Sequence, residues 1–189
     1  MKTEYRLCEA LKEMMEKKPL DEISVVNLTR KCGINRQTFY YHFHDIYDLL
    51  TLLFLNENIP NIDKAKRLRE MVYAIYQYYE DNSLFIDAAL NSAGKELFQQ
   101  FIYNNCFNVI LRLVNEAPNN KRLLTSERRS IARFYALGYA YSIVYYLSLF
   151  ENKSLQGLMA CFCFEKDENL GRAINNYIEY KGMSGNDRF

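Results

Sequence analysis

Apolar residues recur every three to four positions along most of the chain, which is the spacing of one face of an α-helix. In the first stretch Leu7, Leu11 and Met15 share such a face, with lysine and glutamate between them. The run Lys17-Lys18-Pro19 should end this helix, because proline disfavours helical geometry in the residue before it. The pattern therefore predicts a leading amphipathic helix around Leu7–Met15.

Three shorter elements follow the leading helix. Ser24 is typical of a helix N-cap, and Gly33 permits the positive φ that a tight turn between helices requires. Asn35 is expected to cap a third helix over Arg36–Phe43, and Asp45 a fourth. Residues 24–43 are thus predicted to form two short helices joined by a glycine-containing turn, which is a helix-turn-helix.

The rest of the chain is also predicted to be helical. Only three prolines and seven glycines occur in 189 residues, which favours long helices over a turn-rich β architecture. The sequence Asn58-Ile59-Pro60-Asn61 is the best boundary between domains, so we expect an all-α protein with an N-terminal helix-turn-helix domain at 1–57 and a helical domain at 58–189. Helices are expected at about 63–80, 83–91, 93–116, 125–151, 154–164 and 167–181.

Composition narrows the possible partners and the compartment. The net charge is +1, and residues 1–57 hold eight Lys/Arg against nine Asp/Glu, so any contact with a nucleic acid must depend on a few well-placed cations. Five scattered cysteines indicate free thiols in a reducing cytoplasm rather than a disulfide framework. No apolar secretory segment follows Met1. The pair Cys161-x-Cys163 lacks further ligands nearby, so no metal site is expected.

The predicted helix Arg36–Phe43 has two chemically different faces. Phe39 and Phe43, spaced i, i+4, should be buried together with Ile34. The other face carries an arginine and a glutamine that can pair with guanine and adenine, and hydroxyl and imidazole groups that can reach phosphates. From spacing alone, a helical hairpin with an exposed polar face is an equal alternative. The predicted DNA-binding residues are Ser24, Asn35, Arg36, Gln37, Thr38, Tyr40, Tyr41 and His42.

Residues 24–49 resemble the DNA-binding signature of TetR-family transcriptional regulators. Gly33, Ile34, Tyr40, Phe43 and Leu49 fall on the positions that mark this signature, and the leading helix extends the likeness to about residues 5–55. The resemblance implies a sequence-specific, dimeric regulator with a palindromic double-stranded DNA operator as its partner. It also implies a C-terminal ligand-binding and dimerisation domain under the control of a small-molecule effector.

Two positions depart from the family pattern. Thr29 stands where a small residue, often alanine, is usual, and Ile46 stands where a lysine usually contacts a phosphate. A narrower likeness is to regulators of dihydroxyacetone kinase operons, carried by Arg36-Gln37-Thr38-Phe39-Tyr40 and by Ala140–Leu158. It implies an alternative function, a transcriptional activator controlled by a protein partner.

Residues 134–150 contain no charged side chain, and a helix that is apolar all round is buried on every side. Five tyrosines, two serines and the preceding Arg133 argue against a membrane span. The family resemblance implies that the last long helices form the dimer interface, where small residues permit close helix approach. The expected interface residues are Gly138, Tyr141, Ser142, Tyr145, Leu149 and Leu158.

The many aromatic residues have two interpretations. The chain has sixteen tyrosines and twelve phenylalanines, and simple core packing is the alternative to a ligand pocket. The resemblance implies a mostly apolar effector pocket, for which we expect Tyr73, Tyr76, Phe85, Phe101, Tyr103, Phe107 and Tyr135. Since no phosphate loop, zinc-binding helix or nucleophile elbow occurs, no enzymatic activity, cofactor or metal is expected.

Overall fold

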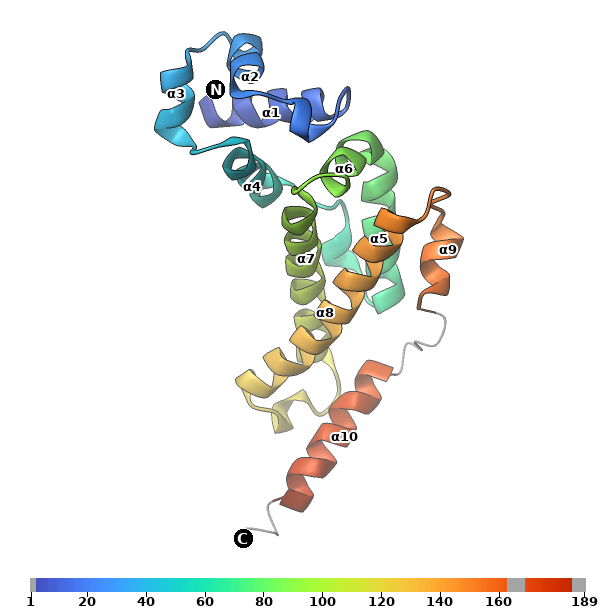
Figure 1. The fold of residues 1–189 in the computed structure, drawn as a ribbon. Coiled ribbons are helices and arrows are strands. Elements are labelled where there is room, and N and C mark those ends of the chain that lie inside the picture. Colours follow the sequence, from blue (N-terminus) through green and yellow to red (C-terminus); the bar gives the residue numbers. More distant parts are fainter. Residues whose placement is uncertain (1–2, 163–168, 185–189) are drawn as a thin grey trace. The chain divides into compact units, whose positions relative to one another are not determined.

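The computed structural model describes residues 3–162 and 169–184, and within those ranges it contains helices and no strands (Figure 1). The all-α prediction is therefore confirmed. The predicted helices at 154–164 and 167–181 fall partly on residues 163–168, outside the described ranges. The helices are α1 (Thr3–Met15), α2 (Val25–Cys32), α3 (Arg36–His42), α4 (Ile46–Asn56), α5 (Leu68–Asp81), α6 (Ser83–Leu90), α7 (Lys95–Glu116), α8 (Thr125–Leu149), α9 (Leu155–Ala160) and α10 (Asn169–Ser184), with 3₁₀ turns at Leu20–Glu22, Ile62–Lys64 and Asn120–Arg122.

The predicted caps begin the short helices. The side chains of Ser24, Asn35 and Asp45 each accept a hydrogen bond from the backbone N–H three residues later, at 3.2, 2.7 and 2.8 Å. Such a bond satisfies one of the unpaired donors in the first turn of a helix. These starts are local features, which explains why the sequence predicted them correctly.

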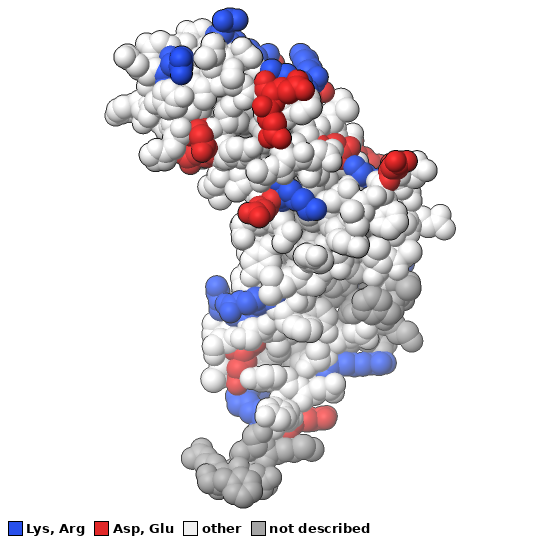
Figure 2. Space-filling view, viewed as in Figure 1, with Lys and Arg blue, Asp and Glu red and all other residues white. Residues whose placement is uncertain are grey.

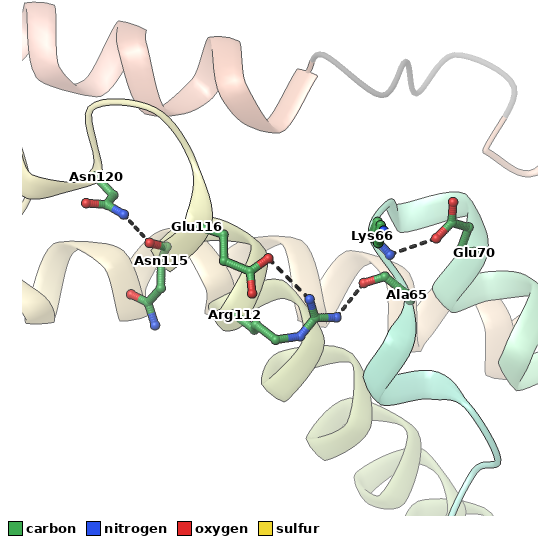
Figure 3. Close-up of polar contacts among 7 residues, drawn as sticks. All are labelled: Ala65, Lys66, Glu70, Arg112, Asn115, Glu116 and Asn120. Atoms are coloured by element: carbon green, nitrogen blue, oxygen red, sulfur yellow. Dashed lines mark hydrogen bonds and ion pairs between the residues drawn. The ribbon is translucent and has the colours of Figure 1, made fainter.

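The start of α5 differs from the prediction. The helix begins at Leu68 rather than near residue 63, because Asn61 adopts a left-handed φ of 61° and a 3₁₀ turn follows at Ile62–Lys64. Arg112 of α7 donates a hydrogen bond to the carbonyl oxygen of Ala65 and pairs with the Glu116 carboxylate (Figure 3). A contact with a helix distant in sequence thus holds the segment that precedes α5.

The described chain divides into two compact units. The first comprises residues 1–59 and 77–101, and the second residues 60–76 and 102–189, so the division passes through α5 and α7. The predicted domain boundary after residue 57 is a division by function and stays a prediction. By packing, residues 77–101 are grouped with the N-terminal helices. No helix in the described ranges is long and apolar enough to span a membrane.

An aromatic cluster forms much of the core of the first unit. The ring of Phe54 on α4 lies 5.5, 5.8 and 5.5 Å from the rings of Phe85, Phe98 and Phe101, measured between centroids. These distances are typical of favourable aromatic pairs. All four side chains are buried, so α4, α6 and the start of α7 share one packed core.

A polar contact beside this core joins three helices of the first unit. Glu57, directly after α4, accepts a hydrogen bond from Lys12 Nζ at 2.6 Å and another from the Tyr78 hydroxyl at 2.8 Å. Lys12 also lies over the ring of Phe85, with Nζ 5.2 Å from its centroid. Burial, followed by the Glu57 carboxylate, raises the pKa of Tyr78. The carboxylate thereby connects α1 and α5 to the end of α4.

In the second unit the long helix α8 has one buried and one exposed face. Ala136, Ala140, Ile143 and Leu147, at helical spacing, are almost completely buried. The opposite face carries exposed aromatic and aliphatic side chains, so the uncharged stretch at residues 134–150 is covered on one side alone by the described chain. The exposed residues are Phe134, Leu137, Tyr141, Tyr145 and Leu149.

Candidate nucleic-acid interface

Helix α3 is fixed to the first unit by its apolar face. Phe39 is fully buried and Phe43 nearly so, with their ring centroids 5.6 Å apart. Ile34 in the preceding turn is half-buried. Because residues i and i+4 lie on one face of a helix, burial of this pair directs the start of α3 outward.

The turn between α2 and α3 depends on a glycine. Gly33 has a φ of 63°, in the left-handed region where other residues are strained. This conformation lets the Ile34 N–H donate a hydrogen bond to the carbonyl oxygen of Thr29 at 3.0 Å. The guanidinium of Arg6 donates a second hydrogen bond to the carbonyl oxygen of Cys32 at 2.6 Å. The turn closes the C-terminus of α2 and sets where α3 begins.

Two of the predicted base-reading side chains are exposed at this start. Arg36 and Gln37 occupy the first turn of α3 and have no hydrogen bond or ion pair with the described residues. Their donors and acceptors therefore face solvent. The first turns of a recognition helix are the part that approaches base edges in the major groove.

Thr38 and Asn35 are engaged with each other. The Thr38 hydroxyl donates to Asn35 Oδ1 at 2.9 Å, and the Thr38 N–H donates to the same oxygen at 2.7 Å. The hydroxyl proton is thus used in the cap. Donation from this hydroxyl to a phosphate would require the bond to Asn35 to break, whereas the methyl group of Thr38 needs no such change to contact a thymine.

The last turn of α3 is rich in exposed rings. The exposed fraction is 51% for Tyr40 and 86% for Tyr41, so both hydroxyls are accessible to a phosphate. His42 is half-buried and its Nδ1 lies 3.3 Å from a carboxylate oxygen of Glu4 on α1. The tyrosines are therefore better placed than the histidine to contact a ligand.

The cations near α3 are of two kinds. Lys31 forms an ion pair with Glu13 at 2.6 Å, which also lowers the pKa of the Glu13 carboxyl. Arg30, one residue earlier on α2, is exposed and has no side-chain partner among the described residues. Sequence reasoning did not select Arg30. Arg30 lies three residues before Gly33 in the sequence, and this closeness to the turn was the signal that could have identified it.

The start of α4 carries two carboxylates, and Ile46 stands where the resembling family usually has a lysine. Asp45 and Asp48 are exposed; Asp45 caps the helix, and Asp48 accepts from the His44 N–H at 3.1 Å. Ile46 is half-buried and lines a shallow hollow of about 330 Å³ together with Ile23 and other residues. Two anions at this position repel a phosphate, so this helix start cannot supply the usual contact.

Charged side chains of both signs occur on the same face of the protein. On the face drawn in Figure 2, basic and acidic side chains are interspersed and form no continuous basic patch. This agrees with the net charge of +1. Binding to a polyanion would therefore rely on Arg30, Arg36 and main-chain donors, with Ser24 exposed at the N-cap of α2.

The predicted dimer residues lie mostly on one face of α8. Tyr141 and Tyr145 are 61% and 52% exposed and their rings stack at 6.0 Å. Gly138 is exposed, Ser142 half-buried and Leu149 60% exposed on the same helix. Leu158 on α9 is fully buried within its own unit.

The residues predicted for an effector pocket are divided between the two units. Phe85 and Phe101 belong to the aromatic cluster of the first unit. In the second unit, Tyr103 and Phe107 stack at 6.0 Å. Tyr73 is half-exposed. The Tyr76 hydroxyl donates a hydrogen bond to the carbonyl oxygen of Lys153, and the Tyr135 hydroxyl donates one to the carbonyl oxygen of Asn169. None of the seven lines the cavity of about 390 Å³ described below.

Comparison with known proteins gives one family model that matches part of the chain and a similarity of fold to a solved structure. Residues 66–149 match a TetR-type family model described as "Transcriptional regulator C-terminal region". The fold is similar to that of the "Dihydroxyacetone kinase operon activator DhaS", with a TM-score of 0.57 and 18% identity over 94% of this chain and 97% of that one. No curated protein sequence matches the chain significantly.

Proposed function

We propose that this chain, a member of the TetR family of transcriptional regulators, binds a palindromic DNA operator as a homodimer and is controlled by a small-molecule effector. The observation that carries DNA binding is the orientation of α3. Phe39 and Phe43 anchor this helix, while Arg36 and Gln37 point outward without partners among the described residues. An arginine and a glutamine so placed can read a guanine and an adenine in the major groove.

The test is selection of bound sequences from a randomised DNA pool, followed by shift assays with the selected site. A dimer with two recognition helices predicts an inverted repeat whose half-sites are about one helical turn, roughly 34–36 Å, apart. Substitution Arg36→Ala should weaken binding by about 1–3 kcal/mol and relax the preference at one base position.

Two further variants separate base reading from charge. Arg36→Lys keeps the cation but loses the planar fork, so it should lose the base preference while retaining the salt dependence of binding. Arg122→Ala removes an exposed arginine from the second unit and should leave binding unchanged. A selected site without two-fold symmetry, or an unchanged base preference in Arg36→Ala, would contradict the proposal.

The homodimer is supported by the exposed face of α8. Phe134, Tyr141 and Leu149 are each at least 60% exposed, and no charge occurs between residues 134 and 150. A Cβ at Gly138 would have nothing within 4 Å, so another helix can approach closely there. The twin surface of a second copy has the matching apolar chemistry. The proposed interface omits Leu158, because that side chain is already buried.

The dimer is tested by sedimentation of the double variant Tyr141→Lys/Tyr145→Lys. Facing lysines across a two-fold axis repel one another, so this variant should sediment as a monomer at micromolar concentration with an unchanged helical circular dichroism spectrum. Tyr73→Lys, an equally exposed tyrosine on α5, is the matched control. If both variants sediment with the same mass, the exposed face of α8 is not the dimer interface.

A second candidate is an activator controlled by a protein partner. It is supported by the resemblance of residues 36–40 and 140–158 to dihydroxyacetone kinase operon regulators. The two candidates differ in a purified system of chain and operator alone. Small-molecule control predicts a ligand that changes DNA affinity in that system, whereas partner control predicts no change until a second polypeptide is added.

A further inference from the structure

The second unit contains a partly enclosed cavity of about 390 Å³, within the size range of small-molecule sites. Its lining residues come from α5, from α8, and from α9 with the residues directly after it. The described lining residues are Arg69, Val72, Tyr139, Gln156, Met159, Ala160 and Phe162.

Hydrogen bonds from two buried tyrosines hold α9 in place beside α5 and α8 (Figure 1). The Tyr146 hydroxyl donates to the carbonyl oxygen of Ser154 at 3.2 Å and accepts from its N–H at 3.1 Å. The Tyr76 hydroxyl donates to the carbonyl oxygen of Lys153 at 3.2 Å. A Cβ at Gly157 would overlap the Tyr146 hydroxyl, so glycine is required for this close approach. The cavity is therefore built into the fold.

The buried part of the cavity lining is mainly apolar and includes two stacked rings. Tyr139 and Phe162 stack in parallel, with centroids 4.6 Å apart and planes at 6°, and both are buried. Val72 on α5 is also almost completely buried. Surfaces of this kind accept aromatic or aliphatic groups and exclude water from them.

The rim of the cavity carries a cation and an amide. Arg69 and Gln156 are exposed, and neither side chain has a hydrogen bond or ion pair with the described residues. The described lining also includes no carboxylate. An arginine is usually solvated at a surface, but here it adjoins a preformed apolar cavity. Its planar fork is suited to a carboxylate or another oxyanion.

We propose that this cavity binds a small organic anion, with the apolar body against Tyr139, Phe162 and Val72 and the oxyanion at Arg69. The identification of this ligand as the effector rests on the function proposed above; the binding itself does not. This cavity is not lined by the aromatic residues that the sequence predicted for an effector pocket. Residues of α9 contribute to its lining instead.

The test uses two fluorescent probes with the full chain in the absence of DNA. The anionic probe is 8-anilinonaphthalene-1-sulfonate, and the neutral probe is N-phenyl-1-naphthylamine, which has the same rings without the sulfonate. The unmodified chain should bind the anionic probe at one site per chain. Arg69→Gln should weaken that binding about 5-fold, as expected for one partly solvated charged contact, and leave the neutral probe unaffected.

Two matched variants complete the experiment. Arg122→Gln, an exposed arginine elsewhere in the unit, should change neither probe. Ala160→Phe should displace both by filling the cavity, with circular dichroism to show that it is folded. Equal effects of Arg69→Gln and Arg122→Gln, or equal weakening of both probes by Arg69→Gln, would overturn the proposal. Because Arg69 is exposed, its variant tests the site even where Ala160→Phe does not fold.

The probe titrations and the DNA selection test the two proposals independently, so either proposal can fail while the other holds. A chain that binds no DNA can still show Arg69-dependent binding of the anion, which would refute the proposed function alone. A chain that binds its operator and shows no Arg69 effect would refute the anion site alone.

Discussion

The contact of Glu57 with Lys12 and Tyr78 makes a sharp prediction about stability. The Lys12 and Glu57 side chains are 21% and 17% exposed, and the carboxylate accepts bonds of 2.6 and 2.8 Å. Substitution Glu57→Gln leaves the Lys12 charge without a counterion in a mostly buried place. A fully buried pair costs about 3–5 kcal/mol to break in this way, and hydrogen bonds to charged groups contribute about 1.5–3 kcal/mol.

Partial exposure reduces the effect, because water screens the remaining charge. We therefore expect Glu57→Gln to lower the free energy of unfolding by about 2–3 kcal/mol. Tyr78→Phe, which removes one of the two bonds, should cost about 1–2 kcal/mol. The assay is urea unfolding followed by circular dichroism, at one protein concentration because the proposed dimer makes stability depend on it.

The control is the same substitution on an exposed carboxylate. Glu116 is paired with Arg112 at 3.3 Å, four residues earlier on α7, and is 59% exposed, so Glu116→Gln should cost less than about 0.5 kcal/mol. Equal losses for Glu57→Gln and Glu116→Gln, with unchanged slopes of the unfolding transition, would refute the role assigned to the Glu57 contact.

Three further predictions concern groups whose environment is unusual. Burial raises the pKa of Cys8 to about 11 and also raises the pKa of Cys106. Iodoacetamide at pH 8 should therefore label the exposed Cys161 and spare Cys8 and Cys106 until urea is added. Peptide mass mapping would show which cysteines are labelled. Burial and then Glu57 raise the pKa of Tyr78, so the folded chain holds that proton more tightly. The resulting stabilisation is present below about pH 10, the usual tyrosine pKa, and is lost as the pH rises towards the higher folded pKa. The midpoint of urea unfolding should therefore fall less between pH 9 and pH 11 in Tyr78→Phe than in the unmodified chain. Gly33 has a φ of 63° and free space around a Cβ, so Gly33→Ala should cost about 1–2 kcal/mol from backbone strain alone; a loss below about 0.3 kcal/mol would contradict this.

The short helices could be predicted because their signals are local. The caps at Ser24, Asn35 and Asp45 act over three residues, and the glycine at 33 acts on its own backbone. Helical spacing likewise predicted the buried pair Phe39 and Phe43, since it depends on the period of the helix alone.

The state of the candidate site residues was decided by contacts between elements. Sequence position alone does not show that Lys31 is paired with Glu13, that His42 faces Glu4, or that Arg30 has no partner among the described residues. Each depends on how α1 packs against α2 and α3, and such packing joins residues far apart in the chain.

The sequence by itself determined the helices, their caps and the outward position of Arg36 and Gln37, because these follow from helix period and backbone chemistry over a few residues. Only the tertiary structure decided which aromatic residues fill a core and which line a cavity. Phe85 and Phe101 entered the cluster around Phe54, whereas the cavity arose where tyrosine hydroxyls attach α9 to α5 and α8. Aromatic side chains occur in both places, and long-range packing decides which of the two each one joins.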